Sequence, residues 1–316
     1  MFWFFEFFHR IFGTFSTTGG QYAKHHHPHF FDEYSSTFTY VLHQGQGSDC
    51  AIIDPVLDYN PNSGRTSTQS AEKVAAYVRE HGLRLQWIIE THAHADHLSA
   101  SVYLREQLGG QTVIGQSITT VQRTFADIFN LSDLATDGSQ FDKLLADGDS
   151  ITLGSLRIEA LHVPGHTPAD SAWRVHMPEG QADVVFVGDT IFSPQEGTAR
   201  CDFPGGSASQ LYQSLHKLLA LPADTRLFLC HSYVDGVAAN PSAFCEYTVA
   251  QQKAGNIHVK DGISEQEFVA MRTKRDATLD MPRLILPSVQ VNIRAGHLPP
   301  AESNGTQYLK IPLNLL

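Results

Sequence analysis

Thr91-His92-Ala93-His94-Ala95-Asp96-His97 is the stretch of sequence that decides the fold of this 316-residue chain. It directly follows Trp87-Ile88-Ile89-Glu90, a short and mostly apolar run of the kind that forms a buried β-strand. His92 and His94 are two residues apart, as ligands in an extended loop are. Asp96 and His97 follow where the chain is expected to enter a helix. Imidazole and carboxylate donors suit zinc, iron or manganese, so the stretch predicts a metal site at the end of a strand.

The same pattern, an apolar run followed at once by a metal-type ligand, occurs at four other places in the chain. Asp54, His166, Asp189 and His231 each follow such a run. Because strands of one sheet system end at a common edge, the loops that leave them can converge. An isolated histidine is more often a structural residue than a ligand, but the order of all these groups argues against that interpretation. We expect one site built from His92, His94, Asp96, His97, His166, Asp189 and His231.

Short β-type runs alternate with helical stretches, which indicates a mixed α/β core. Strands are predicted at residues 38–42, 50–53, 85–89, 112–114, 150–153, 156–163, 184–187 and 227–230. Helices are predicted at residues 70–81, 98–108, 208–219 and 264–275, followed by an extended tail interrupted by prolines. We divide the chain into an N-terminal extension (1–29), a catalytic core (30–252) and a C-terminal extension that caps the core (253–316).

The N-terminal extension is aromatic and histidine-rich. Residues 1–15 contain seven phenylalanines and a tryptophan, but they lack the positive start and the small-residue cleavage site of a secretory signal. They could form a membrane-surface or partner-docking strip, or a poorly ordered tail that begins at a wrongly assigned start codon. The tract from Lys24 to His29 has no rigid frame and no carboxylate partner, so we expect it to be solvated and not to bind a metal.

Composition excludes several classes of function. The net charge of −11 repels phosphate backbones and no basic stripe offsets it, so no nucleic-acid partner is expected. The four cysteines form no C-x-x-C pair, which favours a reducing, cytoplasmic location. No run of roughly 18 apolar residues is present, so no transmembrane segment is expected.

The order H-x-H-x-D-H, followed by single histidine, aspartate and histidine residues at strand ends, resembles the metallo-β-lactamase superfamily over residues 31–255. The resemblance implies an α/β (α+β) fold, the αββα sandwich, with the metal in the cleft between two packed sheets. Asp54 resembles the structural aspartate of that superfamily, which supports the histidine loop from behind.

Two further segments resemble the persulfide dioxygenase (sulfur dioxygenase) branch, including its proteobacterial β-lactamase-like hydrolases. They are Gly197-Thr-Ala-Arg-Cys-Asp-Phe203 and the tail stretch 287–296. In that branch one Fe(2+) is held by residues that match His92, His166 and Asp189, a triad that leaves positions open for substrate and O2. The resemblance implies oxidation of glutathione persulfide with O2 to sulfite and glutathione. His94, Asp96, His97 and His231 would then orient water and the metal ligands, and have a catalytic role.

The resemblance also suggests substrate-binding residues. Arg200 and Tyr233 match residues near the glutathione of the branch, and Arg294 is placed to close the pocket. An ion pair of Arg200 with Asp202 and a structural salt bridge of Arg294 are equally compatible with the sequence. Tyr233 stands in a His-Ser-Tyr run where the branch has His-Asp-Tyr, so Ser232 removes an acidic group from this loop.

Several alternatives remain. One is a hydrolase of glutathione thioesters with two Zn(2+) per chain, similar to glyoxalase II. Against it, Ala95 replaces a bulky aromatic residue, and no long helical glutathione-binding tail is predicted. A non-enzymatic persulfide carrier using Cys201 or Cys230 is a second alternative, and a metal-dependent nuclease is a weaker third. Relatives are often homodimers, so a homodimer is expected by analogy.

Overall fold

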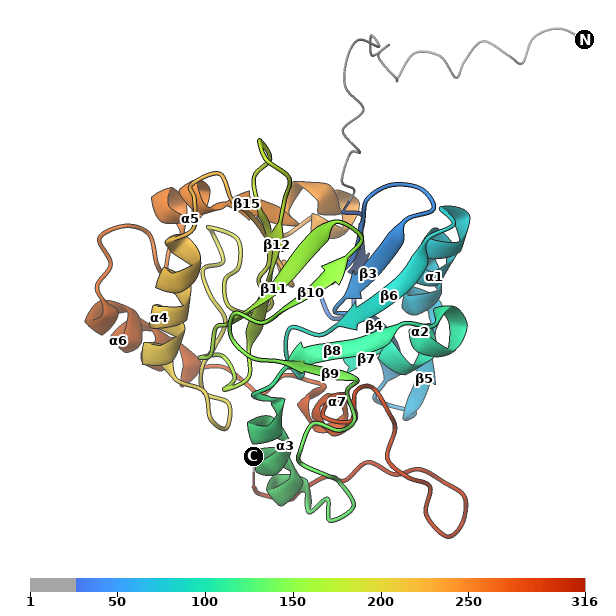
Figure 1. The fold of residues 1–316 in the computed structure, drawn as a ribbon. Helices are drawn as coiled ribbons and strands as arrows, with labels where there is room; N and C mark the ends of the chain where they lie inside the picture. Colours follow the sequence, from blue (N-terminus) through green and yellow to red (C-terminus); the bar gives the residue numbers. More distant parts are fainter. Residues whose placement is uncertain (1–26, 316) are drawn as a thin grey trace, which may run out of the picture.

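The computed structural model describes residues 27–315, so the predictions for residues 1–26 lie outside the described residues. Two six-stranded sheets lie face to face (Figure 1). The first has the order β1 (His29–Asp32), β2 (Thr37–His43), β3 (Asp49–Ile53), β6 (Arg84–Ile89), β8 (Gln111–Gly115) and β9 (Lys143–Leu145). Its first three strands are antiparallel and the remaining pairs are parallel.

The second sheet is antiparallel except at its β13–β14 pair. Its order is β10 (Ser150–Leu153), β11 (Leu156–His162), β12 (Ser171–His176), β13 (Val184–Phe186), β14 (Arg226–Phe228) and β15 (Glu246–Thr248). A small third sheet joins β5 (Arg65–Ser67), β4 (Val56–Asn60) and β7 (Leu98–Ser99).

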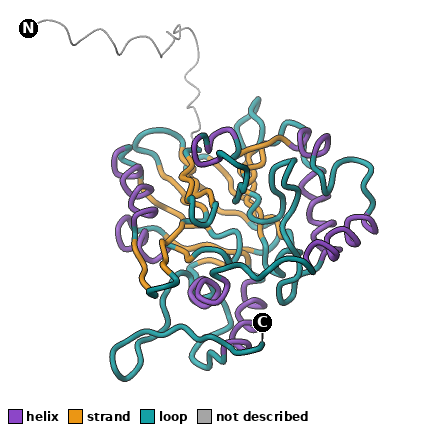
Figure 2. The backbone as a smooth tube through the Cα atoms, turned by 180° about the vertical axis from the view of Figure 1, so that it is seen from behind, coloured by secondary structure: helices purple, strands orange, loops and turns teal. Residues whose placement is uncertain are grey.

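Helices cover the outer faces of both sheets, while the strands fill the centre (Figure 2). On one side lie α1 (Gln69–Glu80) and α2 (Ser101–Leu108), and on the other α4 (Ala208–Leu219), α5 (Val249–Gly255) and α6 (Glu265–Asp276) (Figure 1). Two helices at one end of the sandwich, α3 (Ile118–Phe129) and α7 (Ile285–Asn292), share an apolar cluster. The layers are therefore helix, sheet, sheet and helix, which confirms the predicted αββα sandwich.

Alternating side chains explain this layering. In β2, Phe38 and Tyr40 face the space between the sheets, where they meet Trp173 and Phe186 of the second sheet. Val41 points the other way, into the cluster that packs beneath α1 and α2. A strand with one apolar face toward each layer is buried on both sides, and every residue of β2 is buried.

Most predicted elements are confirmed. The helix predicted at 208–219 is α4 to the residue, and α1 and α6 each lie one residue from their predicted ends. The predicted hairpin is β2–β3, lengthened by one residue at each end of β2 and one at the start of β3. The strands predicted at 156–163 and 184–187 are β11 and β13, each one residue shorter.

Two predictions were wrong. The helix predicted at 98–108 begins only at Ser101, because Leu98 and Ser99 pair with β4 as the strand β7. The tail predicted to be extended forms α7 before it becomes irregular. Pro287 is the third residue of α7, where its missing N–H has no intrahelical acceptor to lose. The proline that suggested an extended tail therefore fits the first turn of a helix.

The structure also bears on the predicted division of the chain into an N-terminal extension, a catalytic core and a C-terminal extension. The strand β1 begins at His29, and the ring of His27 lies edge-on to Phe228 with centroids 5.3 Å apart. The end of the histidine tract is thus part of the fold, contrary to the expectation of a solvated tract. Helix α5 runs through the predicted boundary at residue 252, so a division of the chain here has to follow Gly255. Within residues 27–315, no helix is both long and apolar enough to cross a membrane.

Candidate metal centre

Strands of both sheets deliver the predicted ligands to one place. In the first sheet, β3 is followed by Asp54, and β6 by Glu90 and the histidine loop. In the second sheet, the loops after β11, β13 and β14 carry the others. The predicted residues, and Glu90, which was not predicted as a site residue, are all buried except Asp96, which is partly exposed: Asp54, Glu90, His92, His94, Asp96, His97, His166, Asp189 and His231.

His92, His166 and Asp189 form one compact group whose ligand atoms all lie within 4.8 Å of one another. Asp189 Oδ2 lies 3.6 Å from His166 Nε2 and 3.9 Å from His92 Nε2. Among the described residues, His92 Nε2 and Asp189 Oδ1 have no hydrogen-bond partner although they are buried. Because buried polar atoms are normally paired, this donor set fits a metal ion shared by the three side chains.

In both imidazoles of this group, a contact at Nδ1 orients the ring. His166 Nδ1 donates to the carbonyl oxygen of Arg200 at 2.8 Å, which leaves Nε2 with its lone pair toward the group. His92 Nδ1 lies 3.0 Å from the hydroxyl of Thr91. Contacts of this kind fix the tautomer and the ring orientation of a ligating histidine.

A second group, Asp96, Asp189 and His231, adjoins the first and shares Asp189 with it. His231 Nε2 lies 3.3 Å from Asp189 Oδ1 and 3.5 Å from Asp96 Oδ2. The buried hydroxyl of Thr37 lies 3.2 Å from Asp96 Oδ2 and 3.4 Å from Nδ1 of both His97 and His231. His97 is thus placed beside Asp96 and Thr37, and it belongs to a group with His94 and Asp96.

Asp54 connects the second histidine of the loop to the sheet. Its carboxylate accepts hydrogen bonds from the backbone N–H and hydroxyl of Thr91 at 2.7 and 3.0 Å, and lies 3.0 Å from His94 Nε2. Asp54 has a backbone φ of 49°, the left-handed region that few residues other than glycine adopt. The thiol of Cys230 also points at this carboxylate, at 3.7 Å.

Glu90 is a buried acid of the centre that the sequence analysis missed as a site residue. Its carboxylate accepts hydrogen bonds from the hydroxyls of Ser99 and Ser101, and lies 3.8 Å from His94 Nε2. Asp54, Glu90 and His94 form a third buried group behind the loop. The available signal was an acidic residue at the end of the apolar run 87–89, where a fourth apolar residue is expected.

Burial and neighbouring charges shift the pKa values of these groups. Burial, then the adjacent imidazole of His94, lowers the pKa of His92 well below its ordinary value. For His97 burial is outweighed by the carboxylate of Asp96, which raises the pKa to about 9. Burial and the charge of Asp54 raise the pKa of Glu90 to about 8. At neutral pH His92 therefore presents a neutral imidazole, the form that binds metals.

A cavity of about 590 Å³ opens onto His166, Asp189 and Asp96. Much of its wall is apolar, with Phe192, Phe203, Val234, Ile257 and Leu279. Its volume lies within the range of small-molecule sites, and its mixture of apolar wall and polar groups is typical of them.

The three predicted substrate-binding residues lie in different surroundings. Tyr233 lines the cavity, is 57% exposed, and stacks on His231 with ring centroids 5.6 Å apart. Arg200 also lines it, but its guanidinium forms two hydrogen bonds to Asp202, at 2.6 and 2.7 Å. Arg294 is not among the lining residues; its guanidinium pairs with Asp133 at 3.0 Å.

Three further charged residues line the cavity and were missed: Glu196, Arg272 and Arg275. Arg272 and Arg275 belong to α6, so the C-terminal region supplies part of the cavity wall. Their sequence signal was the basic end of the helix predicted at 264–275. Sequence alone does not show on which side of the core that helix packs.

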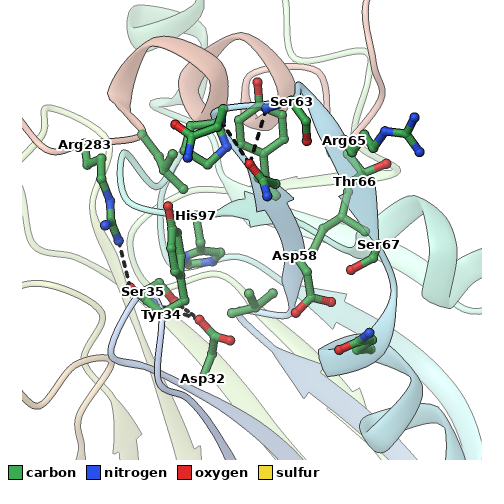
Figure 3. A pocket seen from close by; sticks show the side chains of 18 residues that line it. Asp32, Tyr34, Ser35, Asp58, Ser63, Arg65, Thr66, Ser67, His97 and Arg283 are labelled. Atoms are coloured by element: carbon green, nitrogen blue, oxygen red, sulfur yellow. Dashed lines mark hydrogen bonds between the residues drawn. The ribbon is translucent and has the colours of Figure 1, made fainter.

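A second cavity, of about 630 Å³, has His97 among its lining residues (Figure 3). The β4–β5 hairpin forms one wall, and Tyr34 and Arg283 form another. Its acids are already paired within the fold: Asp58 accepts from Ser70, and Asp32 accepts from Ser35. The centre thus borders two cavities, one lined by Asp96, His166 and Asp189 and the other by His97.

The sandwich, the order of its ligand loops and the shared carboxylate together define a class of metal-binding enzyme. The chain belongs to the Metallo-beta-lactamase superfamily, whose family model matches residues 33–231.

The individual relatives fall into two groups by sequence identity, near 50% and near 30%. The chain is 52% identical over 292 residues to a "Probable metallo-hydrolase" of Burkholderia pseudomallei, covering 91% of this chain and 98% of that one. It is 48% identical over 284 residues to "Glyoxylase B2" of Dictyostelium discoideum, covering 89% and 94%. It is 31% identical over 268 residues to human mitochondrial "Persulfide dioxygenase ETHE1", covering 84% and 87%. The crystal structure of ETHE1 from Myxococcus xanthus is similar with a TM-score of 0.67 and 29% identity, covering 86% and 99%.

Proposed function

We propose that the chain is a persulfide dioxygenase that oxidises glutathione persulfide with O2 at one non-haem iron per chain. The observation that carries the proposal is the group His92, His166 and Asp189 at the end of a cavity large enough for a tripeptide. Two imidazoles and one carboxylate are the ligand set of non-haem iron oxygenases, which leaves positions open on the metal. Similarity to human and Myxococcus xanthus ETHE1 supports the same reaction.

In the balanced reaction, glutathione persulfide, O2 and water give glutathione and sulfite with release of two protons. The outer sulfur loses four electrons, the two oxygen atoms gain them, and the sulfur–sulfur bond breaks. Bound iron would supply the site where O2 and the outer sulfur meet. His92 and His166 each present Nε2 to that place, and the carbonyl of Arg200 keeps His166 in the tautomer with a free Nε2.

The cavity suits a peptide-like thiol that carries carboxylates. The apolar wall contacts the substrate backbone, while Arg275 supplies a cation from α6. Within residues 27–315, no acid lies within ion-pair distance of Arg275, whereas Arg200 is committed to Asp202. We therefore assign the carboxylate contact to Arg275, and to Arg200 a role in holding the loop. A guanidinium binds a carboxylate through two parallel hydrogen bonds.

Asp96, His97 and His231 are proposed to orient the substrate and the ligands. The hydroxyl of Thr37 lies between all three and reaches Nδ1 of both imidazoles. His97 Nδ1 is also 3.1 Å from Asp96 Oδ2. These contacts orient both rings through Nδ1, and Nε2 of His97 and of His231 has no hydrogen-bond partner among the described residues.

The second candidate is a hydrolase of glutathione thioesters with two Zn(2+) per chain. It is favoured by the group Asp96, Asp189 and His231, which shares Asp189 with the first group as a bridging ligand would. The similarity to "Glyoxylase B2" points the same way. The missing helical tail no longer argues against it, because α6 lines the cavity.

One preparation assayed in two ways separates the candidates. Elemental analysis of the purified protein should give about one iron per chain, and addition of glutathione persulfide should consume O2 and form sulfite in equal amounts. Near two zinc ions per chain with rapid hydrolysis of S-lactoylglutathione would contradict the dioxygenase and support the hydrolase.

Two variants control this experiment. His166→Ala should lose both the metal and O2 consumption, since it removes one of three ligands. His216→Ala changes a histidine on the exposed face of α4, whose Nδ1 contacts the backbone carbonyl of Tyr212, and should retain both. Loss of activity in both variants would mean that the assay responds to misfolding and does not test the role of His166 as a metal ligand.

A further inference from the structure

Glu196 lies at the tip of a tight turn that follows β13. The backbone N–H groups of Glu196 and Gly197 both donate to the carbonyl of Ser193, each at 2.9 Å. Gly197 has a φ of +85°, and a Cβ there would lie 2.1 Å from the ring of His258. The turn therefore holds Glu196 in one position on the wall of the cavity of about 590 Å³ beside the metal group.

The carboxylate of Glu196 reaches across to the loop after β14. Its Oε1 accepts a hydrogen bond from the backbone N–H of Tyr233 at 2.5 Å. Its Oε2 accepts from the hydroxyls of Ser193 at 2.6 Å and Ser232 at 3.5 Å. One acid thus links two loops that come from neighbouring strands of the second sheet.

Tyr233 is the side chain whose place this contact sets. Its ring stacks on His231, with an interplanar angle of 11°, and meets Phe192 edge-on with centroids 5.9 Å apart. The ring remains 57% exposed and lines the cavity. A shift of the Tyr233 backbone would therefore change the shape of the cavity directly above His231.

Ser232 is fully buried between His231 and Tyr233. It is also the position where the persulfide dioxygenase branch carries an aspartate. An aspartate here would place a second carboxylate about where the Ser232 hydroxyl now lies, beside Glu196. A carboxylate at the fully buried position 232 and the half-buried carboxylate of Glu196 would repel each other at such a distance. We therefore expect the contact between the two loops to tolerate one carboxylate and to be weakened by a second.

We propose that Glu196 supplies, from a different segment of the chain, the acidic group that Ser232 lacks, and that it is a positioning residue which holds Tyr233 over His231. The role in catalysis rests on the proposed function, because Tyr233 is placed to contact the glutathione part of the substrate. The contact between the two loops does not depend on which reaction the centre performs.

The test is a double-mutant cycle that removes the carboxylate at position 196 and introduces one at position 232. Glu196→Ala should raise KM for glutathione persulfide roughly tenfold and leave kcat within about twofold, because it moves Tyr233 and leaves the metal ligands in place. Ser232→Asp should raise KM to a similar extent. Combining Ser232→Asp with Glu196→Gln should restore KM to within about twofold of wild type, since one carboxylate again lies between the loops.

Two matched controls separate charge from size and position. Ser232→Asn has the shape of aspartate without its charge and should change KM less than Ser232→Asp. Glu179→Gln removes an exposed acid in the β12–β13 turn and should leave KM unchanged. Melting temperatures of all variants are measured alongside, and Ser232→Asp should be less stable alone than together with Glu196→Gln.

A second measurement keeps this test distinct from that of the proposed function. The Kd of glutathione for the purified holoprotein, measured by calorimetry, should follow the same order as KM. If no variant oxidises persulfide but the Kd values follow this order, the dioxygenase fails and the role of Glu196 stands. A Kd unchanged by Glu196→Ala, or Ser232→Asp equally harmful with and without Glu196→Gln, overturns the proposal. If Glu196→Ala does not fold, the comparison of Ser232→Asp in the two backgrounds decides.

Discussion

Asp276, at the end of α6, accepts a hydrogen bond from the backbone N–H of Cys201 at 2.9 Å. The same carboxylate pairs with the buried guanidinium of Arg272, which donates to the carbonyl of Thr198 at 3.0 Å. The C-terminal region thus holds the loop that carries Arg200, whose carbonyl orients His166. A contact far from the metal group in sequence therefore acts on one of its ligands.

Asp276→Ala should cost about 3–5 kcal/mol of unfolding free energy, because it leaves the buried charge of Arg272 unpaired. Because the loop then no longer fixes His166, metal affinity should fall about tenfold or more. Urea unfolding and competition with a metal-binding dye measure the two effects. Asp261→Ala, at an exposed acid 3.9 Å from Lys253, is the control. Unchanged metal affinity in Asp276→Ala would break the proposed connection to His166.

Removing the metal should lower the melting temperature. An ion whose free concentration is a thousand times its Kd stabilises the folded state by about 4 kcal/mol. Without the ion, the buried atoms His92 Nε2 and Asp189 Oδ1 have no partner. Treatment with a chelator should therefore lower the Tm of the wild type and leave that of Asp189→Ala unchanged. Asp224→Ala, at an exposed position, should respond like the wild type. An equal response of Asp189→Ala to the chelator would show that Asp189 does not hold the ion.

Substitution of Asp54 should separate its backbone from its charge. Asparagine tolerates the left-handed φ of 49°, so Asp54→Asn loses only the charged acceptor for Thr91, about 1.5–3 kcal/mol. Asp54→Ala loses the acceptor and adds backbone strain of about 1 kcal/mol. Unfolding free energies should fall in the order wild type, Asp54→Asn, Asp54→Ala. A reversal of the two variants would contradict this account of the backbone.

Burial raises the pKa of the Cys201 thiol to about 12. At pH 8 only about one thiol in ten thousand is then ionised, and the thiolate is the form that reacts. Iodoacetamide should therefore label Cys201 of the folded protein slowly compared with the protein in urea, and Cys201→Ser should retain O2 consumption. Rapid labelling, with loss of function in Cys201→Ser, would instead support the persulfide carrier.

Stability should depend on pH through His258. Burial, then the charge of Arg272, lowers its pKa to about 4, and its Nδ1 accepts a hydrogen bond from the N–H of Thr198 at 3.0 Å. Above pH 6.5 the ring is neutral in both states and its contribution is complete. Between pH 6.5 and 4 the unfolded chain binds a proton that the folded chain does not, so the free energy of unfolding decreases as the pH is lowered through this range. Urea unfolding at several pH values should show a shallower fall in His258→Asn, and parallel curves for both proteins would exclude this origin.

The metal group could be predicted from the sequence because its logic is local. Each ligand follows an apolar strand, and strands of packed sheets end at a shared edge. That rule placed His92, His166 and Asp189 near one another without any knowledge of long-range contacts. The helix α4 and the β2–β3 hairpin could also be predicted from local signals, the periodicity of apolar residues and the residues of the turn.

The remaining parts of the site depend on tertiary packing. The contacts of Glu196 depend on the length of one turn, and those of Arg275 on the side of the core against which α6 packs. Helix α3 was missed although Val121, Phe125 and Phe129 recur every four residues on its buried face. Arg200 was expected at the substrate because its motif matched, but its partner Asp202 is two residues away, and the sequence was equally compatible with both roles.

Helix α7 is hydrogen-bonded to the histidine loop, which carries the first residues of the candidate metal centre. The side-chain amide of Asn292 donates to the carbonyls of His94 and His97, each at 2.8 Å, and accepts from the N–H of Ser99. A ribosome makes all seven residues of the candidate centre, the last of them His231, before it reaches residue 292. During synthesis the chain therefore already carries all of these side chains while the loop 91–97 still lacks its contacts with Asn292. The contacts that Asn292 makes with this loop can form only after α7 has been synthesised.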